Sequence, residues 1–455
     1  MPDHDTPCVP HDPVVVIGGG IAGLSAAWHL QQRGIPVRVY EGTPRVGGRI
    51  HSVEDGGRLE TGMQFYYSSY SSTFELLRTF GLDSELVPIH VRGLMYWRGD
   101  IRPWDKSKPY LSLLSSMENL RLQAAVARKL VPLMRMCPFD YQAGDPLDDV
   151  DAADYFRALG GEAVTELAVR PMVTSYAFTE PEGHSLAMLL RIMRLGAFSK
   201  MYGLLGGNDS LPAAMARQLD VVHAPVVEVL FEDGAVAGVV IEEAGERKTV
   251  RTRRVVCAVR GSQAGALFGG VPKLAAAFDA LSYSNIVLAN LHLDRPLSGP
   301  DWCYVLSREA GHRAAFGVDL TRRSPKMFPD GRSVLQVNFA DPVAGELLGA
   351  SDDAITATAM NDMEAFLPGV SDWVTRTSVV RRPRALPNFP CGMFGAVRAI
   401  EAMAEEIDGL HLAGDYLRAP LCEGAVRSGQ ACAQAISAAT TYVAGRSSAG
   451  APSRC

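Results

Sequence analysis

A glycine-rich turn that follows a run of β-branched residues is the feature that most constrains this chain. Residues 14–17 read Val-Val-Val-Ile, which predicts a buried strand of a parallel sheet. Gly18, Gly20 and Gly23 follow with the spacing G-x-G-x-x-G, where the strand would turn into a helix. In this spacing the first glycine permits a tight turn, the second lets a pyrophosphate approach the backbone, and the third lets the helix pack on the strand. The N-terminus of the helix would then face the phosphates.

The residues after this turn complete a dinucleotide-binding unit. A helix is expected to about Gln32, Gly34 ends it, and residues 36–40 predict a second strand. Glu41 closes that strand, 18 residues after Gly23, where an acidic side chain can accept hydrogen bonds from ribose hydroxyls. The alternative is a glycine-rich turn in another α/β fold.

Length and composition limit the classes of protein to be considered. With 455 residues the chain is too long for one compact core, so two or three domains are expected. Hydrophobic residues make up 47% and charged residues 21%, which is the balance of a folded globular protein. The net charge of −6 gives no sign of nucleic-acid binding. No apolar run approaches the roughly 18 residues of a membrane span.

The N-terminus and the cysteines favour a cytoplasmic protein. Residues 1–13 lack the apolar core of a secretory signal. The 8 cysteines form no C-x-x-C pair and the 10 histidines show no H-E-x-x-H spacing, so neither a metal site nor a dithiol redox site is predicted. Reduced thiols in the cytoplasm fit this pattern best.

Two further motifs follow the second strand. Residues 47–49 read Gly-Gly-Arg, in which the glycines allow the backbone to approach a ligand and Arg49 can pair with a phosphate. Residues 60–64 then read Glu-Thr-Gly-Met-Gln. The whole series resembles the amine oxidase, protoporphyrinogen oxidase and phytoene desaturase superfamily of FAD enzymes. Nicotinamide dehydrogenases generally lack the Gly-Gly-Arg motif, so NAD is the alternative cofactor.

A second signature lies near the C-terminus. Residues 410–416 read Leu-His-Leu-Ala-Gly-Asp-Tyr, which predicts a strand with Asp415 at its end. Residues 423–429 read Glu-Gly-Ala-Val-Arg-Ser-Gly and open a helix. This block resembles plant-type phytoene desaturases and bacterial squalene or hydroxysqualene desaturase-like enzymes. Because the signatures lie near opposite ends, the resemblance spans the full chain.

The resemblance implies a set of contacts with FAD. Arg49 would contact FAD, residues 60–64 would run beside the flavin ring, Asp415 would bond the ribityl chain, and backbone groups at Val227 would pair with the adenine. Amides near residues 424–426 would face flavin N1 and O2, where a helix dipole stabilises an anionic reduced flavin. The expected cofactor-binding residues are Gly18, Gly20, Ala22, Gly23, Glu41, Gly48, Arg49, Gly62, Met63, Gln64, Val227, Gly414, Asp415, Gly424, Ala425 and Val426.

The resemblance also implies an α/β fold, in which a Rossmann-like FAD-binding domain of the glutathione-reductase type carries an inserted mixed α+β substrate domain. The expected boundaries are 1–88, 204–280 and 386–442 for the FAD-binding domain, 89–203 and 281–385 for the substrate-binding domain, and 443–455 for a flexible tail. Residues 90–200 read as helix-rich. Within them, residues 113–136 favour a packed helix with a solvated basic face, and a membrane-surface helix is the alternative.

The type of reaction depends on whether loss of the hydride oxidises a C–N or a C–C bond of the substrate. Amine oxidases usually carry an aromatic residue in the loop before the flavin-facing helix and a lysine near flavin N5. Here Leu421 and Cys422 occupy that loop, and residues 286–293 contain no lysine. Cys422 also lies outside the segment used for covalent attachment, so non-covalent FAD is expected. The catalytic candidates are Gln64, Tyr66 and Tyr67, with Tyr70, Tyr176 and His184 as further candidates.

The leading hypothesis is an FAD-dependent oxidoreductase that dehydrogenates or desaturates a largely apolar or polycyclic small molecule by hydride transfer to flavin N5. The alternatives are an FAD amine or amino-acid oxidase that releases an imine and hydrogen peroxide, and a non-catalytic flavoprotein scaffold. Oxygen or another acceptor would take the electrons. A monomer or homodimer is expected, in the cytoplasm, with peripheral membrane contact left open.

Overall fold

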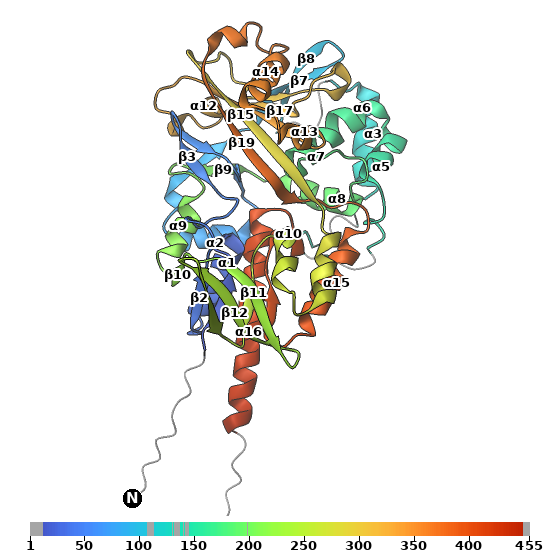
Figure 1. Cartoon of the computed structure of the whole chain (residues 1–455). Coiled ribbons are helices and arrows are strands. Elements are labelled where there is room, and N and C mark those ends of the chain that lie inside the picture. Colours follow the sequence, from blue (N-terminus) through green and yellow to red (C-terminus); the bar gives the residue numbers. More distant parts are fainter. Residues whose placement is uncertain are drawn as a thin grey trace, which may run out of the picture.

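The computed structural model describes residues 12–106, 113–129, 131, 137–139, 141, 145–197 and 199–448. Two sheets organise the chain: a parallel sheet in the lower half of Figure 1 and a mixed sheet in the upper half. The α/β fold class predicted from the sequence is confirmed.

The parallel sheet has the strand order β10-β2-β1-β14-β20. Its strands are β1 (Val14–Ile17), β2 (Val37–Tyr40), β10 (Val221–Val222), β14 (Val255–Cys257) and β20 (Leu410–Leu412). β1 lies at the centre and all of its residues are buried, as its β-branched side chains predict. The sequence predictions of β1, β2 and β20 are confirmed.

Two helices from opposite ends of the chain pack against each other beside this sheet. α1 (Ile21–Gln31) follows the glycine turn, and α16 (Cys422–Ser448) follows β20 (Figure 1). A Cβ atom on Gly429 of α16 would lie 2.3 Å from the Ala22 carbonyl oxygen of α1, so only glycine allows this approach. Ser25 of α1 donates its hydroxyl to the Val426 carbonyl at 2.8 Å. The N-terminal and C-terminal signatures therefore fold into one unit.

The mixed sheet has the strand order β19-β15-β18-β17-β16-β7-β8. Its strands are β7 (Arg92–Trp97), β8 (Asp100–Asp105), β15 (Tyr283–Leu293), β16 (Cys303–Val305), β17 (Phe316–Asp319), β18 (Val334–Ala340) and β19 (Val374–Pro387). One face packs Val287, Leu291 and Val337 under α13 (Val343–Leu347) and α14 (Asp352–Met363). The other face carries the buried amides of Asn290 and Gln336.

Residues 90–200 are less helical than the sequence suggests, because β7 and β8 form an antiparallel hairpin within them. The hairpin turn places Arg98 and Gly99 at φ values of 50° and 86°. In β7 the buried residues Gly93, Met95 and Trp97 alternate with less buried ones, which is the period-two pattern of a strand. The many leucines and methionines that surround this short hairpin conceal its pattern in the sequence.

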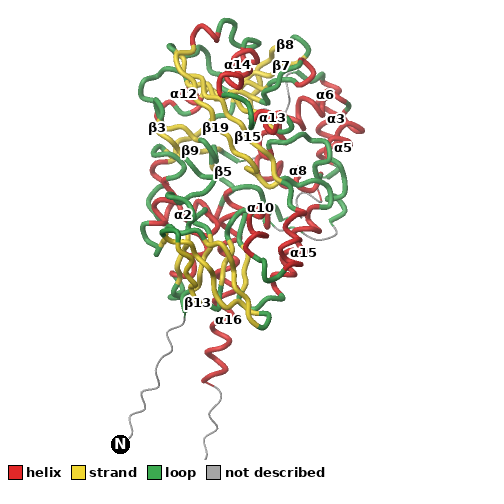
Figure 2. The backbone as a smooth tube through the Cα atoms, in the orientation of Figure 1, coloured by secondary structure: helices red, strands yellow, loops and turns green. Residues whose placement is uncertain are grey.

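The rest of this segment is helical. Its elements are α3 (Ser116–Ala127), α5 (Ala152–Gly160), α6 (Glu162–Val164), a π-helical turn (Thr165–Val169), α7 (Arg170–Ala177) and α8 (Leu186–Ala197). Figure 2 shows α3, α5, α6 and α8 gathered on one side of the molecule. The helix expected within 113–136 is present as α3, and residues 130 and 132–136 lie outside the described residues. Within the described ranges, no helix is long and apolar enough to cross a membrane.

Further strands and helices lie outside the two main sheets. The strands are β3 (Ser52–Glu54), β4 (Arg58–Glu60), β5 (Tyr66–Tyr67), β6 (Leu86–Ile89), β9 (Met201–Leu204), β11 (Val226–Glu232), β12 (Ala235–Glu243) and β13 (Glu246–Arg251). The helices are α2 (Ser71–Thr79), α9 (Ser210–Ala216), α10 (Gly261–Ala264), α11 (Pro272–Ala277), α12 (Leu320–Arg323) and α15 (Met393–Glu405).

The boundaries of the two domains stay predictions. The strands of the parallel sheet lie within the segments assigned to the FAD-binding domain. Those of the mixed sheet lie within 89–203 and 281–385, except that β19 runs to Pro387. α16 continues to Ser448 and so enters the segment 443–455 that was expected to be a tail, while residues 449–455 lie outside the described residues.

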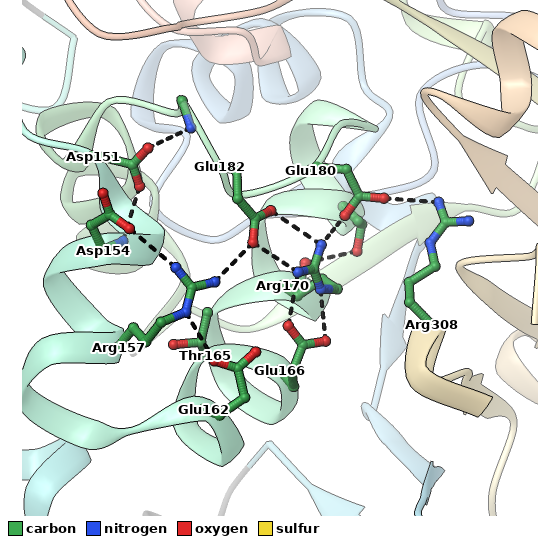
Figure 3. A network of polar contacts seen from close by, with 12 residues as sticks. Asp151, Asp154, Arg157, Glu162, Thr165, Glu166, Arg170, Glu180, Glu182 and Arg308 are labelled. Carbon is green, nitrogen blue, oxygen red and sulfur yellow. Dashed lines mark hydrogen bonds and ion pairs between the residues drawn. The ribbon is translucent and has the colours of Figure 1, made fainter. Parts of the chain in front are cut away.

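A network of arginines and carboxylates joins the helical segment to the mixed sheet (Figure 3). Arg170, at the start of α7, donates two hydrogen bonds of 2.8 Å to Glu166 and also contacts Glu180 and Glu182. Glu180 in turn pairs with Arg308, between β16 and β17, at 3.0 Å. Burial opposes the charge of Arg170, but the three carboxylates outweigh it and raise its pKa. The network therefore holds the helical segment in place.

Replacing Arg170 should cost far more stability than replacing its neighbour Arg157. Arg170→Met would leave three carboxylates without their buried cation and should lower the free energy of unfolding by about 3 kcal/mol. Arg157 also pairs with acidic residues, but its side chain is 36% exposed, so Arg157→Met should cost less than about 1 kcal/mol. Urea denaturation of both variants measures the difference. Equal losses would show that burial adds nothing to the Arg170 network.

Candidate functional site

Two glycine-rich loops lie side by side at the carboxyl end of β1. The Gly47 amide donates to the Gly19 carbonyl at 2.8 Å, and a Cβ on Gly48 would lie 3.4 Å from the Gly20 Cα. A Cβ on Gly20 itself would meet nothing within 4 Å, so the backbone is open to a ligand there. A Cβ on Gly23 would lie 2.0 Å from the Gly18 carbonyl oxygen, as expected for close packing of helix on strand.

Glu41 holds these loops at the end of β2. Its buried carboxylate accepts hydrogen bonds from the Gly19 amide at 2.7 Å and from the Thr43 amide and hydroxyl at 2.8 and 2.7 Å. A carboxylate has about four lone-pair sites, so acceptor capacity remains for a ribose hydroxyl. Glu41 therefore has a structural role in addition to the one predicted for it.

Arg49 and Asp415 are joined directly in the structure. The two guanidinium nitrogens Nη1 and Nη2 each donate to a different oxygen of Asp415 at 2.7 Å, and Nη1 also donates to the Ala385 carbonyl at 3.0 Å. Burial disfavours the charge of Arg49, but Asp415 outweighs this effect and raises its pKa. The guanidinium keeps Nε–H and one Nη2 proton for a ligand. The sequence predicted both residues as ligands but not their contact.

Further arginines lie near this pair, and Arg260 and Arg382 form no ion pair with a carboxylate among the described residues. The pKa of Arg260 is lowered by burial and by repulsion from Arg49 and Arg384. The pKa of Arg382 is lowered by burial and by repulsion from Arg45 and Arg260. Cations that repel one another in this way favour binding of an anion. The residues present therefore fit the pyrophosphate of FAD, together with the open backbone at Gly20.

α16 starts at Cys422, one residue before Glu423, where the sequence motif was expected to open the helix. The Ala425 amide already donates to the Leu421 carbonyl at 3.1 Å. The amides of Cys422, Glu423 and Gly424 precede the first bond of this kind. Of residues 424–426, only Gly424 thus belongs to the set of amides expected to face the flavin. Gly414 lies nearby and donates its amide to Ser428 Oγ at 2.9 Å.

Glu423, the acidic residue of the C-terminal signature, caps another helix. Its buried carboxylate accepts hydrogen bonds from the amides of Ser72 and Thr73 at 3.0 and 2.9 Å, at the start of α2. It also accepts from the Thr73 hydroxyl at 2.8 Å and pairs with Arg427 at 2.7 Å. This N-terminal position favours a negative charge. Sequence reasoning missed this role, because α2 lies far from Glu423 in the chain.

The segment after β4 packs against the Gly-Gly-Arg loop. A Cβ on Gly62 would lie 1.8 Å from the Arg49 carbonyl oxygen, so this position requires glycine. The Met63 amide donates to the same carbonyl at 3.1 Å. Gln64 Nε2 donates to the Glu60 and Gly62 carbonyls at 3.0 and 3.1 Å, and its Oε1 accepts from Arg323 at 2.8 Å. Gln64 is therefore fixed in one orientation.

Tyr66 and Tyr67 differ in their surroundings. Tyr66 is fully buried, its hydroxyl donates to the Asn208 carbonyl at 3.0 Å, and burial raises its pKa well above the ordinary value. This arrangement suits packing better than proton transfer. Tyr67 is half-buried with its pKa raised to about 12 by burial, and Lys106 Nζ lies 4.9 Å from its ring centre. Tyr67 therefore remains the better candidate to contact a substrate.

The structure joins two residues that the sequence analysis named separately. The Tyr176 hydroxyl and His184 Nε2 are 2.5 Å apart, and both side chains are buried. Burial lowers the pKa of His184 to about 4, so the imidazole is neutral at pH 7 and accepts or donates one proton in this bond. The pair lies beside the segment that leads back from β19, because the Ser185 amide donates to the Phe389 carbonyl.

Val227 and Cys422 were also singled out in the sequence, and the structure places them in β11 and at the start of α16. Val227 falls at a register shift between Val226 and Glu228 of β11, which leaves it outside the regular pairing with β12. Cys422 is buried, and burial raises the pKa of its thiol to about 12. Among the described residues, no group of three or more His, Cys, Asp or Glu side chains could hold a metal ion.

The chain matches the family model described as flavin containing amine oxidoreductase over residues 21–437. It therefore belongs to the flavin-containing amine oxidoreductase family, which places it among the FAD-dependent oxidoreductases.

Three proteins illustrate the similarity. "Probable zeta-carotene desaturase" from Synechococcus elongatus is 27% identical over 49% of this chain and 48% of its own length, so the match spans about half of that relative. Zeta-carotene desaturase from Synechocystis sp. is 24% identical over 93% of this chain and 96% of its own. Cyclohexylamine oxidase from Brevibacterium oxydans has a TM-score of 0.74 at 18% identity, over 95% of this chain and 100% of its own, which shows a common fold.

Glu41→Ala should weaken FAD binding. Loss of charge-assisted hydrogen bonds to the ribose, at roughly 1.5–3 kcal/mol, corresponds to an affinity about 10- to 100-fold lower. Thr43→Val is the control, because it removes one hydrogen bond to Glu41 but keeps the carboxylate. Quenching of FAD fluorescence on titration with apoprotein measures both affinities. An equal loss in the two variants would assign the effect to the loop and not to the ribose.

Glu60 should make stability depend on pH. Burial raises its pKa from 4.5 to about 7, so between these values the folded chain holds a proton that the unfolded chain releases. The contribution of Glu60 to stability therefore falls as pH rises through this window, by about 3 kcal/mol in total. Glu60→Gln removes the titration, so its stability relative to the parent chain should increase from pH 5 to pH 8.

Urea denaturation of the FAD-loaded proteins at several pH values measures this difference. Glu54→Gln serves as control, because it makes the same exchange at an exposed position of β3. A Glu60→Gln difference that does not change with pH would contradict the raised pKa of Glu60.

Proposed function

We propose that this chain dehydrogenates or desaturates a largely apolar or polycyclic small molecule by hydride transfer to flavin N5. The convergence of Arg49, Asp415 and the surrounding arginines beside Gly20 supports binding of FAD. Bound FAD supplies the hydride acceptor, and the chain supplies orientation and electrostatics.

One observation favours oxidation of a C–C bond of the substrate over oxidation of a C–N bond. On β15, where an amine oxidase would carry a lysine near the flavin, the chain has Asn285 and Asn290. Asn285 donates to Asp341 at 3.2 Å, and Asn290 accepts from Gln336 at 3.0 Å. Both side chains thus form hydrogen bonds within the protein, and neither has an amine for proton transfer. The similarity to zeta-carotene desaturases supports the same choice.

The chain's own residues mainly position the reactants. Gln64 is held by two backbone carbonyls and by Arg323, so the segment proposed to line the flavin is rigid. The amides at the start of α16 would stabilise negative charge on the reduced flavin. Orientation alone can supply a large part of the rate when hydride transfer is the chemical step.

Non-covalent binding of FAD belongs to the same proposal. The Cys422 thiol is buried, and its pKa of about 12 keeps it protonated and unreactive at neutral pH. Oxygen or another acceptor would reoxidise the flavin.

A peripheral contact with membranes has one observation in its favour. α3 exposes Met117 and Leu120, at 57% and 59%, next to the exposed Arg121. An apolar surface with flanking basic residues is typical of helices that lie on a lipid surface.

The alternative function is an FAD amine or amino-acid oxidase. The family model describes amine oxidoreductases, and the half-buried ring of Tyr67 is of a kind that can contact a cationic amine.

Anaerobic reduction tests these functions against each other. The purified protein should be yellow and should release intact FAD on acid precipitation. Tetrapyrroles or isoprenoids should bleach the flavin, whereas primary amines should not. Bleaching by amines alone would establish the alternative, and flavin that stays with the precipitate would contradict non-covalent binding. A flavin that no reductant of either class bleaches would favour a scaffold.

A further inference from the structure

Arg323 is a buried cation whose charge its surroundings do not balance. It is the last residue of α12, and only 6% of its surface is exposed. Its Nη1 donates to Gln64 Oε1 at 2.8 Å, which is its one hydrogen bond to the described residues, and its Nε is buried without a partner there. Burial lowers its pKa to about 10, so the guanidinium is still charged at neutral pH.

Glu60 does not supply the missing counter-charge. Its charge acts on Arg323 more strongly than that of any other acidic group, but its two carboxylate oxygens are held elsewhere. The Asn208 amide donates to Oε1 at 2.9 Å, and the Ser52 hydroxyl donates to Oε2 at 2.8 Å. Its pKa of about 7 also leaves it only partly ionised at neutral pH. An uncompensated buried cation is unfavourable, and an anion that binds it offsets part of that cost.

Gln64 places Arg323 next to the proposed reaction site. Because Gln64 Nε2 is committed to the Glu60 and Gly62 carbonyls, its Oε1 points to Arg323. Gly62, Met63 and Gln64 are the residues expected beside the flavin ring. Arg323 therefore lies one side chain away from that segment, on the side of the mixed sheet.

The surroundings of Arg323 are otherwise mainly apolar. Leu320, one turn earlier in α12, belongs to a buried cluster between the mixed sheet and the segment proposed to line the flavin. The cluster also includes Leu59, Trp302, Met327 and Phe328, and the rings of Phe65 and Tyr67 pack against it. A ligand that reaches Arg323 would thus meet one cation among aromatic and aliphatic side chains.

We propose that Arg323 binds a carboxylate of the substrate, so that the substrate is an organic acid with a large apolar body. This rests on the function proposed above and adds the chemical class of the substrate. The planar edge of a guanidinium matches the two oxygens of a carboxylate better than any other cationic side chain does. The carboxylate would fix the position of the substrate, and its apolar body would lie against apolar side chains next to Arg323.

Binding of a matched pair of probes to the FAD-loaded protein tests this inference. 2-Naphthoate and 2-naphthamide differ only in the charged group, and isothermal titration calorimetry measures both affinities without turnover. The parent chain should prefer naphthoate at least tenfold. Arg323→Met should lower the affinity for naphthoate about 10- to 100-fold and leave that for naphthamide unchanged. Arg323→Lys should restore part of the preference. Arg332→Met, which removes an exposed cation nearby, should keep all of it.

Several results would overturn the inference. Equal affinities of the parent chain for the two probes would do so, even if the variants failed to fold. A full preference for naphthoate in folded, flavin-loaded Arg323→Met would do so too. If Arg323→Met shifted the reduction potential of the flavin but not the preference, Arg323 would serve the cofactor instead.

Failure of the proposed function gives a different result. If the protein bound no flavin but still preferred naphthoate, and this preference depended on Arg323, the proposed function would be wrong and the carboxylate site would stand. If the flavin-loaded protein showed no preference for naphthoate, the carboxylate site would be wrong and the proposed function would stand.

Discussion

The position of Arg49 determines how the rest of the candidate site is assembled. Its side chain joins Asp415 at the end of β20 and the Ala385 carbonyl of β19, and its own carbonyl receives the Met63 amide. Gly62 must be a glycine because the same carbonyl lies against it. One residue therefore ties the segment after β4 to two segments near the C-terminus. A guanidinium suits this task, because its planar set of donors fixes direction as well as distance.

The glutamates of the cofactor motifs serve the fold as well as the ligand. Glu41 accepts the Gly19 amide, Glu60 accepts the Asn208 amide, and Glu423 accepts two amides at the start of α2. Each satisfies backbone donors that would otherwise be buried without partners. An acidic residue in a cofactor motif is thus not by itself evidence of a ligand contact. For Glu423, the contacts account for the residue without any cofactor.

The sequence predicts those parts of the structure that depend on local patterns. The β-branched run, the glycine spacing and the C-terminal signature specify β1, α1, β20 and the start of α16, because backbone geometry and burial act over a few residues. The β7–β8 hairpin was missed, since it is short and the elements that follow it, from α3 to α8, are helical. The arginines at 260 and 382, the Tyr176–His184 contact and Arg323 belong to no motif. Only the folded chain brings them together, so their roles depend on contacts over long sequence distances.

The two faces of the mixed sheet have different roles: one packs against helices, and the other faces the candidate site. Under α13 and α14, side chains such as Val287 and Val337 form a packed apolar layer. On the opposite face, the amides of Gln336 and Asn290 bond each other and the Glu60 carbonyl, so their hydrogen-bonding capacity is largely used within the protein. Polar groups whose hydrogen bonds are already made within the protein discriminate little between ligands, because ligand binding does not change their hydrogen-bond partners. Specificity must then come from a group with capacity left, and on this side of the site Arg323 has that capacity.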